Sequence, residues 1–537
     1  MCELTSFAFA TAVCISALLA FTTVKKYRTR AGLTTCILSL RPINEKAEQM
    51  KAEQMKSALA NVNELPDAIR GCKYPAKQHN LKVKEHLLSK ENTLSEQTTA
   101  LFITGEKLEN NKYCDTTREF RQNRYFYYLS GVDIPGCSLL FNFKTNALTL
   151  FLPNIEWDDV LWSGMPLSLE EAFEKFDVDE IVYCNEIEEK LKHDCFGFRI
   201  FTTDLDNVCP KLKDYLIAGD DSFFYAMDEA RIIKDSYEIA IIRKATEITD
   251  VCHLAVMSAL PIEINEIHIE AEFAYHATRQ GARSLGYDPI CCSGPACGTL
   301  HYIKNSEDLD KKASVLIDAG AEWRNYTSDV TRCFPISGKF TKEHREIYEA
   351  VLDVQSEVMK RIKAGVHWED LHILSHKVLI KHLLELGIFK REYSEEEIFE
   401  RKASCGFYPH GLGHLMGLDV HDVGGRPNYE DKNVYFQYLR MRRELQENMV
   451  ITNEPGCYFN KYLIAEYLHK YPEREEVVDF NVVEKYMYVG GVRIEDDILV
   501  TKDGHENLTK ITSDPKEIEK IVTDAISKGR AAFHVLA

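Results

Sequence analysis

Strand-like and helix-like segments alternate along two long stretches of this chain, and this alternation predicts an α/β protein with two folded domains. Apolar runs such as 99–103 and 138–143 are typical of buried strands. Segment 169–173 is helix-like, and Ser168 is suited to cap its N-terminus. A length of 537 residues also exceeds that of one ordinary domain.

The domain limits follow from these patterns. We expect the first domain over residues 77–220 and the second over 227–522, with a C-terminal tail at 523–537. The small, polar stretch 218–222 is a suitable boundary. A long helical stretch from about Met227 is expected to open the second domain, because apolar residues from Ile239 to Cys252 recur at helical spacing.

The N-terminus carries an uncharged segment, residues 4–24, directly followed by basic residues from Lys25 onward. A bilayer span needs about 20 apolar residues, and basic residues on the downstream flank place that side in the cytosol. We therefore expect residues 1–25 to form a membrane anchor and 26–76 a solvated tether, with a cytosol-facing enzyme. The alternatives are a removed signal sequence, a weakly hydrophobic targeting segment, or a soluble cytoplasmic protein.

Composition excludes one class of partner. With 65 basic and 84 acidic residues, the net charge of −19 argues against a nucleic-acid-binding protein, which would show a basic surface. The 16 cysteines form no C-x-x-C pair, so free thiols in a reducing compartment are the expected state.

Five side chains in the last 220 residues are candidate metal ligands. Asp318 ends the strand-like run 314–317, and Asp329 begins a second run. A chain reversal near 323–325 would form a hairpin with the two carboxylates opposite each other. The other three candidates are His414 in a glycine-rich loop, Glu454 before a Pro-Gly turn, and Glu495 on the same strand face as Arg493.

Each of these residues alone could simply be a turn or loop residue. Their occurrence together is not explained in that way. Four carboxylates and one imidazole gathered in one place would repel one another, and two divalent cations would cancel the charge. Oxygen-rich ligands with one imidazole favour Mn²⁺, with Co²⁺ or Zn²⁺ as alternatives. Two metals about 3.5–4 Å apart can produce a nucleophilic hydroxide at neutral pH.

The order of motifs resembles that of the eukaryotic prolidases (Xaa-Pro dipeptidases) and aminopeptidase P, members of the pita-bread metallopeptidases. The resemblance spans about residues 77–522 and implies a creatinase-like α/β domain followed by a pita-bread catalytic domain. The matching stretches are 120–122, 127–132, Lys234 with Glu238 and Arg243, 286–287, 300–302, 317–320, 327–331, 409–422, 453–456 and 490–497.

The resemblance also implies roles. Asp318, Asp329, His414, Glu454 and Glu495 fall on the family's metal ligands, with Asp329 and Glu495 as the bridging pair. Glu454 would also shuttle a proton during attack of water on the Xaa-Pro carbonyl.

Further positions fall where family members contact the substrate. His301 and His421 would stabilise the tetrahedral intermediate. Arg440 matches an arginine that grips the carboxylate of a terminal proline. Tyr287 and Arg493 are expected to line the site, whereas His410 is expected to be structural.

The expected function is hydrolysis of Xaa-Pro dipeptides, with small peptides that carry proline at the second position as substrates. The alternatives are an aminopeptidase P that accepts longer peptides, and an inactive pita-bread protein that only binds a partner. Family members are commonly dimers, so a homodimer is also expected.

Overall fold

The structure is a computed structural model, and it describes residues 64–528. Its first domain is built on a six-stranded mixed sheet with the strand order β4-β3-β2-β1-β5-β6. The strands at its centre, β1, β2 and β3, are antiparallel neighbours, and the outer strands join in parallel. The strands are β1 (Thr99–Thr104), β2 (Ser138–Asn142), β3 (Ala147–Leu152), β4 (Glu180–Tyr183), β5 (Arg199–Thr202) and β6 (Leu216–Ala218).

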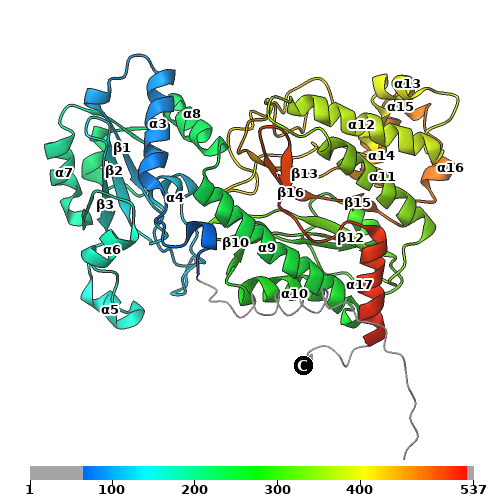
Figure 1. The fold of residues 1–537 in the computed structure, drawn as a ribbon, viewed down its shortest axis with the longest axis horizontal. Coiled ribbons are helices and arrows are strands. Elements are labelled where there is room, and N and C mark those ends of the chain that lie inside the picture. Colours follow the sequence, from blue (N-terminus) through cyan, green and yellow to red (C-terminus); the bar gives the residue numbers. More distant parts are fainter. Residues whose placement is uncertain (1–63, 529–537) are drawn as a thin grey trace, which may run out of the picture. The chain divides into compact units, whose positions relative to one another are not determined.

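Helices cover both faces of this sheet (Figure 1). Leu101 and Leu139 face a core that includes helix α3, whereas Phe102 and Leu140 face a second core that includes α7. This alternation explains why both predicted strands are apolar throughout. The helices are η1 (Asp67–Ile69), α3 (Ala76–Lys90), η2 (Glu96–Thr98), α4 (Arg124–Ser130), α5 (Trp157–Ser163), α6 (Leu169–Lys175), η3 (Cys184–Glu186), α7 (Ile187–Asp194) and η4 (Pro210–Tyr215).

The expected tether does not extend to residue 76. Ile69 and Tyr74 are buried, and the hydroxyl group of Tyr74 lies 3.1 Å from that of Tyr326 in the second domain. Residues 64–76 are therefore part of the folded structure.

The single helical stretch expected from Met227 is instead two helices. Met227 lies in α8 (Asp221–Ile232), which packs along α3, and α9 (Ser236–Ala259) begins after a short extended break. Asp235 caps α9, and the carboxylate of Glu238 bonds back to the Asp235 amide. This capping box fixes the start of α9, so the break is set by local hydrogen bonding.

The second domain repeats one arrangement, in which a pair of helices precedes a group of strands. Helices α9 and α10 precede β7–β12, and α11 and α12 precede β13–β17; Figure 1 shows α9 and α10 on one side and α11 and α12 on the other. An isolated bridge joins Thr331 of the first half to Glu495 of the second, so the strands of the two halves meet there.

The bounds in this domain are η5 (Leu260–Ile262), α10 (Glu266–Arg279), β7 (Ser284–Leu285), β8 (Ile290–Ser293), η6 (Gly294–Gly298), β9 (Ser314–Asp318), β10 (Ala321–Trp323), β11 (Tyr326–Thr327), β12 (Thr331–Pro335), α11 (Lys342–Met359), α12 (Trp368–Glu385), α13 (Glu395–Glu400) and η7 (Ala403–Gly406). They continue with β13 (Val450–Asn453), β14 (Gly456–Tyr458), α14 (Lys461–Ile464), the π-helical turn η8 (Ala465–His469), α15 (Pro472–Glu475), α16 (Phe480–Val483), β15 (Gly491–Arg493), β16 (Asp496–Val500), β17 (His505–Asn507) and α17 (Pro515–Lys528).

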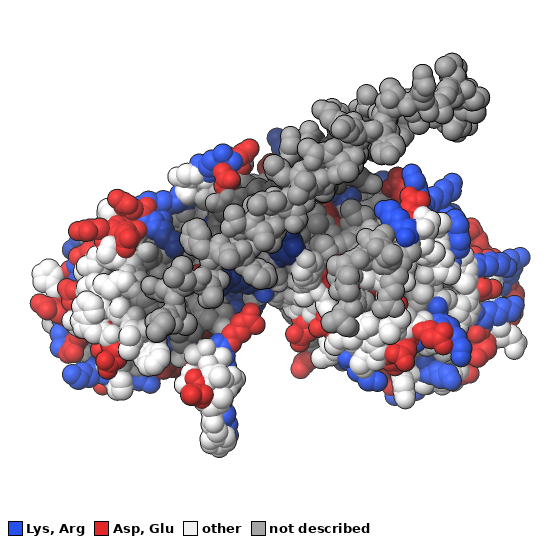
Figure 2. Space-filling model, turned by 90° about the horizontal axis from the view of Figure 1, so that it is seen from below, with Lys and Arg blue, Asp and Glu red and all other residues white. Residues whose placement is uncertain are grey.

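The predicted anchor, residues 1–25, lies outside the described residues and stays a prediction, as does the homodimer. Between residues 64 and 528, no helix is both long and apolar enough to cross a membrane. The cysteines of this part of the chain are free thiols. On the face shown in Figure 2, basic and acidic side chains are interspersed.

Candidate metal centre

Two aspartates are brought together by a hairpin, as the sequence predicts. Asp318 is the last residue of β9, and Asp329 lies two residues before β12, which pairs antiparallel with β9. The chain reverses at 324–325, between β10 and β11. In the ladder, Asp318 faces Thr331 rather than Asp329. The hydroxyl group of Tyr287 nevertheless reaches both carboxylates, at 2.6 Å from Asp318 and 2.5 Å from Asp329.

His414 points its free ring nitrogen at two of the carboxylates. Its Nδ1 lies 3.0 Å from the carbonyl oxygen of Leu415, which can only accept, so the ring proton is on Nδ1. Its Nε2 lies 3.3 Å from Asp329 Oδ2 and 3.5 Å from Glu454 Oε1. Burial lowers the pKa of His414 to about 4, so the imidazole is neutral at pH 7 and presents a lone pair to two carboxylate oxygens.

Arg493 ends β15 and Glu495 lies just before β16. Both side chains contact Thr331, so they lie on one side of the chain, as alternation predicts. Arg493 Nη2 donates to Asp318 Oδ2 at 2.5 Å, and Thr331 Oγ1 donates to Glu495 Oε2 at 2.6 Å. Ile494, between them, is fully buried in the core.

A cavity of about 630 Å³ opens onto these groups. Its lining includes the predicted ligand and substrate-contact residues. Among them are His301 from one loop, and His421 and Arg440 from the long connection between η7 and β13. The predicted members of its wall are Tyr287, His301, Asp318, Asp329, His414, His421, Arg440, Glu454, Arg493 and Glu495.

The electrostatics of the cluster indicate a deficit of positive charge. Burial raises the pKa of Glu454 to about 8, and burial with neighbouring carboxylates raises the pKa values of Asp329 and Glu495 well above their usual range. Asp329, His414 and Glu495 each offer a ligand atom, and these atoms lie within 4.8 Å of one another. Arg493 is the one guanidinium bonded to the cluster among the described residues. A cation between these atoms would relieve the repulsion.

Comparison with known proteins agrees with this geometry. Residues 240–502 match the model of metallopeptidase family M24, and residues 79–197 match that of the aminopeptidase P N-terminal domain. A Saccharomyces cerevisiae protein named as an uncharacterized peptidase is 67% identical over 90% of this chain and 91% of its own length. The chain belongs to metallopeptidase family M24.

Other M24 relatives carry more specific names. A "Probable Xaa-Pro aminopeptidase" of Botryotinia fuckeliana is 44% identical over 86% of this chain and 99% of its own length. Among solved structures, Escherichia coli aminopeptidase P with the inhibitor Pro-Leu superposes with a TM-score of 0.69 and 28% identity, over 85% of this chain and all of that one. This chain is therefore a metallopeptidase, and the predicted α/β fold with an aminopeptidase P-type first domain is confirmed.

Membership of M24 implies divalent metal ions, and the residues present fit them. The inward lone pair of His414 faces oxygens of Asp329 and Glu454, and the raised pKa values of these two carboxyl groups mark a site where a cation would be stabilised. Carboxylate oxygens with one imidazole are a suitable donor set for Mn²⁺ or Zn²⁺.

Supporting residues at the M24 site escaped the sequence reasoning. Asp497 accepts hydrogen bonds from Ser328 Oγ at 2.7 Å and from the Asp329 amide at 3.0 Å, so it fixes the backbone at a candidate ligand. Strand alternation from Glu495 could have found it. The hydroxyl group of Tyr458 lies 2.8 Å from His410 Nε2 and accepts from Arg493 at 3.0 Å, which agrees with a structural role for His410; no sequence signal marks Tyr458.

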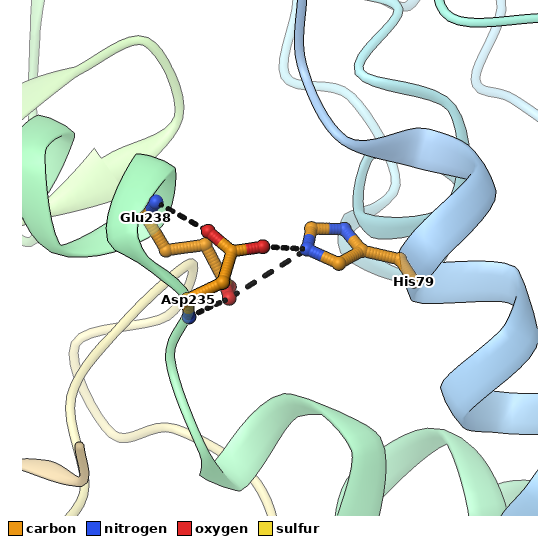
Figure 3. A group of neighbouring side chains, drawn as sticks. All are labelled: His79, Asp235 and Glu238. Atoms are coloured by element: carbon orange, nitrogen blue, oxygen red, sulfur yellow. Dashed lines mark hydrogen bonds and ion pairs between the residues drawn. The ribbon is translucent and has the colours of Figure 1, made fainter. Parts of the chain in front are cut away.

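A second cluster of potential ligands lies at the domain boundary, where His79, Asp235 and Glu238 meet (Figure 3). His79 Nε2 lies 2.9 Å from Asp235 Oδ2 and 3.6 Å from Glu238 Oε2, and Nδ1 lies 2.7 Å from the Tyr128 carbonyl oxygen. Both carboxylates are already used in the capping box of α9. Ion pairing and capping account for this cluster, so it needs no metal.

Proposed function

We propose that this chain is an exopeptidase that hydrolyses the Xaa-Pro bond with a two-metal centre. Asp318, Asp329, His414, Glu454 and Glu495 would hold two divalent ions, with Mn²⁺ favoured by the oxygen-rich set. The observation that carries the proposal is the neutral His414, whose lone pair faces carboxylates across a gap of 3.3–3.5 Å. When bound, such ions acidify a water molecule and polarise the scissile carbonyl.

The chain's own residues supply proton transfer and orientation. The raised pKa of Glu454, about 8, suits a carboxyl group that takes a proton at one stage and returns it to the leaving proline nitrogen at another. His421 is held neutral, because burial lowers its pKa to about 2. Its ring stands at 89° to that of His414, with centroids 4.5 Å apart. From this position His421 and His301 can donate N–H groups to the developing oxyanion.

Arg440 supports dipeptides as the preferred substrates. Its guanidinium lines the cavity, and between residues 64 and 528 it has no carboxylate partner. A half-buried, unpaired guanidinium can bind the carboxylate of a C-terminal proline through two parallel hydrogen bonds.

Longer peptides are the second candidate class. A further cavity of about 350 Å³ also includes Arg440, His421 and Tyr429, so there is space beyond the arginine. The names of the fungal relatives and the likeness to aminopeptidase P favour this alternative.

The test compares hydrolysis of an Xaa-Pro dipeptide and an Xaa-Pro-Xaa tripeptide by the Mn²⁺-loaded full chain, with EDTA as the control. Metal-dependent cleavage confined to the dipeptide is the expected result. Preference for the tripeptide would instead establish an aminopeptidase P, and cleavage of neither by metal-loaded protein would contradict the proposal.

The variant Arg440→Met separates the two classes further. It should raise the dipeptide KM by about 10-fold or more, because a charged hydrogen bond contributes about 1.5–3 kcal/mol. The kcat should change little, since the carboxylate is bound equally before and during reaction. An unchanged dipeptide KM would remove Arg440 from the substrate site.

A further inference from the structure

A buried arginine of the first domain contacts the hairpin that carries two candidate metal ligands. Arg124 is the first residue of α4 and is 7% exposed. It follows the segment 120–122, which matches the family pattern but has no part in the chemistry proposed above. A guanidinium is seldom buried without a specific set of acceptors.

The acceptors of Arg124 are on the far side of the domain boundary. Its Nη2 lies 2.5 Å from Glu322 Oε2, and its Nη1 donates to the side-chain oxygen of Asn325. Glu322 is the middle residue of β10, and Asn325 forms the turn to β11, so both belong to the arm between Asp318 and Asp329.

Arg124 also faces the loop that carries His414 and His421. Its Nε lies 3.8 Å from Asp419 Oδ1. Asp419 in turn accepts from Arg231 at 2.9 Å, and the same guanidinium lies 2.6 Å from Asp422. The buried Arg231 guanidinium thus holds the loop on both sides of His421, through the partly exposed Asp419 and the buried Asp422.

We infer that Arg124 is a positioning residue, through which the first domain fixes the ligand hairpin and the His421 loop relative to each other. Its planar guanidinium is directed at both elements at once, which a lysine ammonium on a flexible stem cannot reproduce. The first domain then takes part in metal binding, because Arg124 holds the elements that carry the candidate ligands. This inference depends on the proposed assignment of Asp318, Asp329 and His414 as ligands.

The test measures Mn²⁺ affinity by calorimetry on the full-length chain, together with kcat, KM and the melting temperature. Arg124→Lys and Glu322→Gln both weaken the Arg124–Glu322 contact, and Glu322→Gln also removes the ion pair of Glu322 with Arg121 at 3.7 Å. Each should weaken Mn²⁺ binding by about 10- to 100-fold, the usual cost of losing a residue that orients metal ligands. The double variant should be little worse than Glu322→Gln alone, because Arg124→Lys acts through a contact that Glu322→Gln has already weakened.

Tyr125→Phe is the matched control. Tyr125 is the next residue of α4 and donates to Asp228 of α8 at 2.8 Å, without a contact to the ligand hairpin. It should lower the melting temperature while Mn²⁺ affinity stays within about twofold of the wild type. Equal losses of Mn²⁺ affinity in Arg124→Lys and Tyr125→Phe would overturn the inference, as would wild-type affinity in both Arg124→Lys and Glu322→Gln.

The metal readout separates this inference from the proposed function. If the wild type binds Mn²⁺ but cuts no Xaa-Pro peptide, the function is wrong and the role of Arg124 is still measured. If the wild type cuts the peptide and Arg124→Lys matches it in Mn²⁺ affinity, the inference alone is wrong.

Discussion

At the position of Glu454 the protein places a carboxyl group where burial alone makes ionisation costly. Desolvation is the largest cause of its raised pKa, and Arg493 acts in the opposite direction. The carboxylate also approaches His414 at 3.5 Å. A group so placed can bind a cation or carry a proton, which are the two roles proposed for it.

The variant Glu454→Gln tests the proton-carrying role. It should lower kcat by about 10²- to 10⁴-fold, because the amide cannot accept and return a proton. Binding of a non-hydrolysable substrate analogue to Mn²⁺-loaded variant, measured by calorimetry, should weaken far less. A variant that keeps near-normal turnover would show that another group moves the proton.

At the scale of elements, the hairpin between Asp318 and Asp329 requires close contact of two backbone segments. A Cβ atom at Gly320 would lie 1.7 Å from the carbonyl oxygen of Ser328, the residue before Asp329. The Ser328 amide also donates to the Ala321 carbonyl at 3.1 Å, which holds the segments together. Glycine at 320 therefore sets the distance between the strands that position the two aspartates.

Gly320→Ala should separate these segments. We expect a loss of about 1–3 kcal/mol in the free energy of unfolding, as for other overpacked sites, and weaker Mn²⁺ binding. Urea denaturation and calorimetry measure the two effects. Gly504→Ala is the control, because its Cβ would meet only the Thr501 hydroxyl at 3.8 Å; equal effects of the two variants would contradict this account.

At the scale of the whole molecule, buried histidines couple folding to pH. Both ring nitrogens of His344 on α11 are buried without a hydrogen-bond partner, and burial lowers its pKa to about 3. In the unfolded chain a histidine titrates near 6.5. Below about pH 6.5 the unfolded state therefore binds a proton that the folded state rejects, so stability falls as the pH falls toward 3.

His344→Phe should reduce this acid sensitivity. Between pH 6 and 4, the free energy of unfolding of the wild type should fall by up to about 1.4 kcal/mol per pH unit more than that of the variant. The variant lacks this imidazole and so takes up one fewer proton on unfolding. Urea titrations of the metal-free protein at several pH values provide the measurement. If the slopes of the wild type and His344→Phe were parallel, the argument would be contradicted.

The sequence by itself predicted the parts of the fold that depend on local pattern. The strands around Phe102 and Leu140, the capped helix after Ser168 and the reversal near Asn325 all form as expected. Short-range rules suffice there, because side-chain alternation, caps and turns involve residues near in sequence. Local pattern singled out the five candidate ligands, but their metal role followed only from the set as a whole and from its resemblance to the pita-bread metallopeptidases.

Only the tertiary structure decided which groups support those ligands and where helices break. Arg124 is separated from Asn325 by 201 positions, and Asp497 from Ser328 by 169, so no local signal links them. The break between α8 and α9 depends on a cap at Asp235 that also pairs with His79 of another domain. Charge neutralisation and burial are set by what packs against a residue, and packing partners distant in sequence are fixed only when the chain has folded.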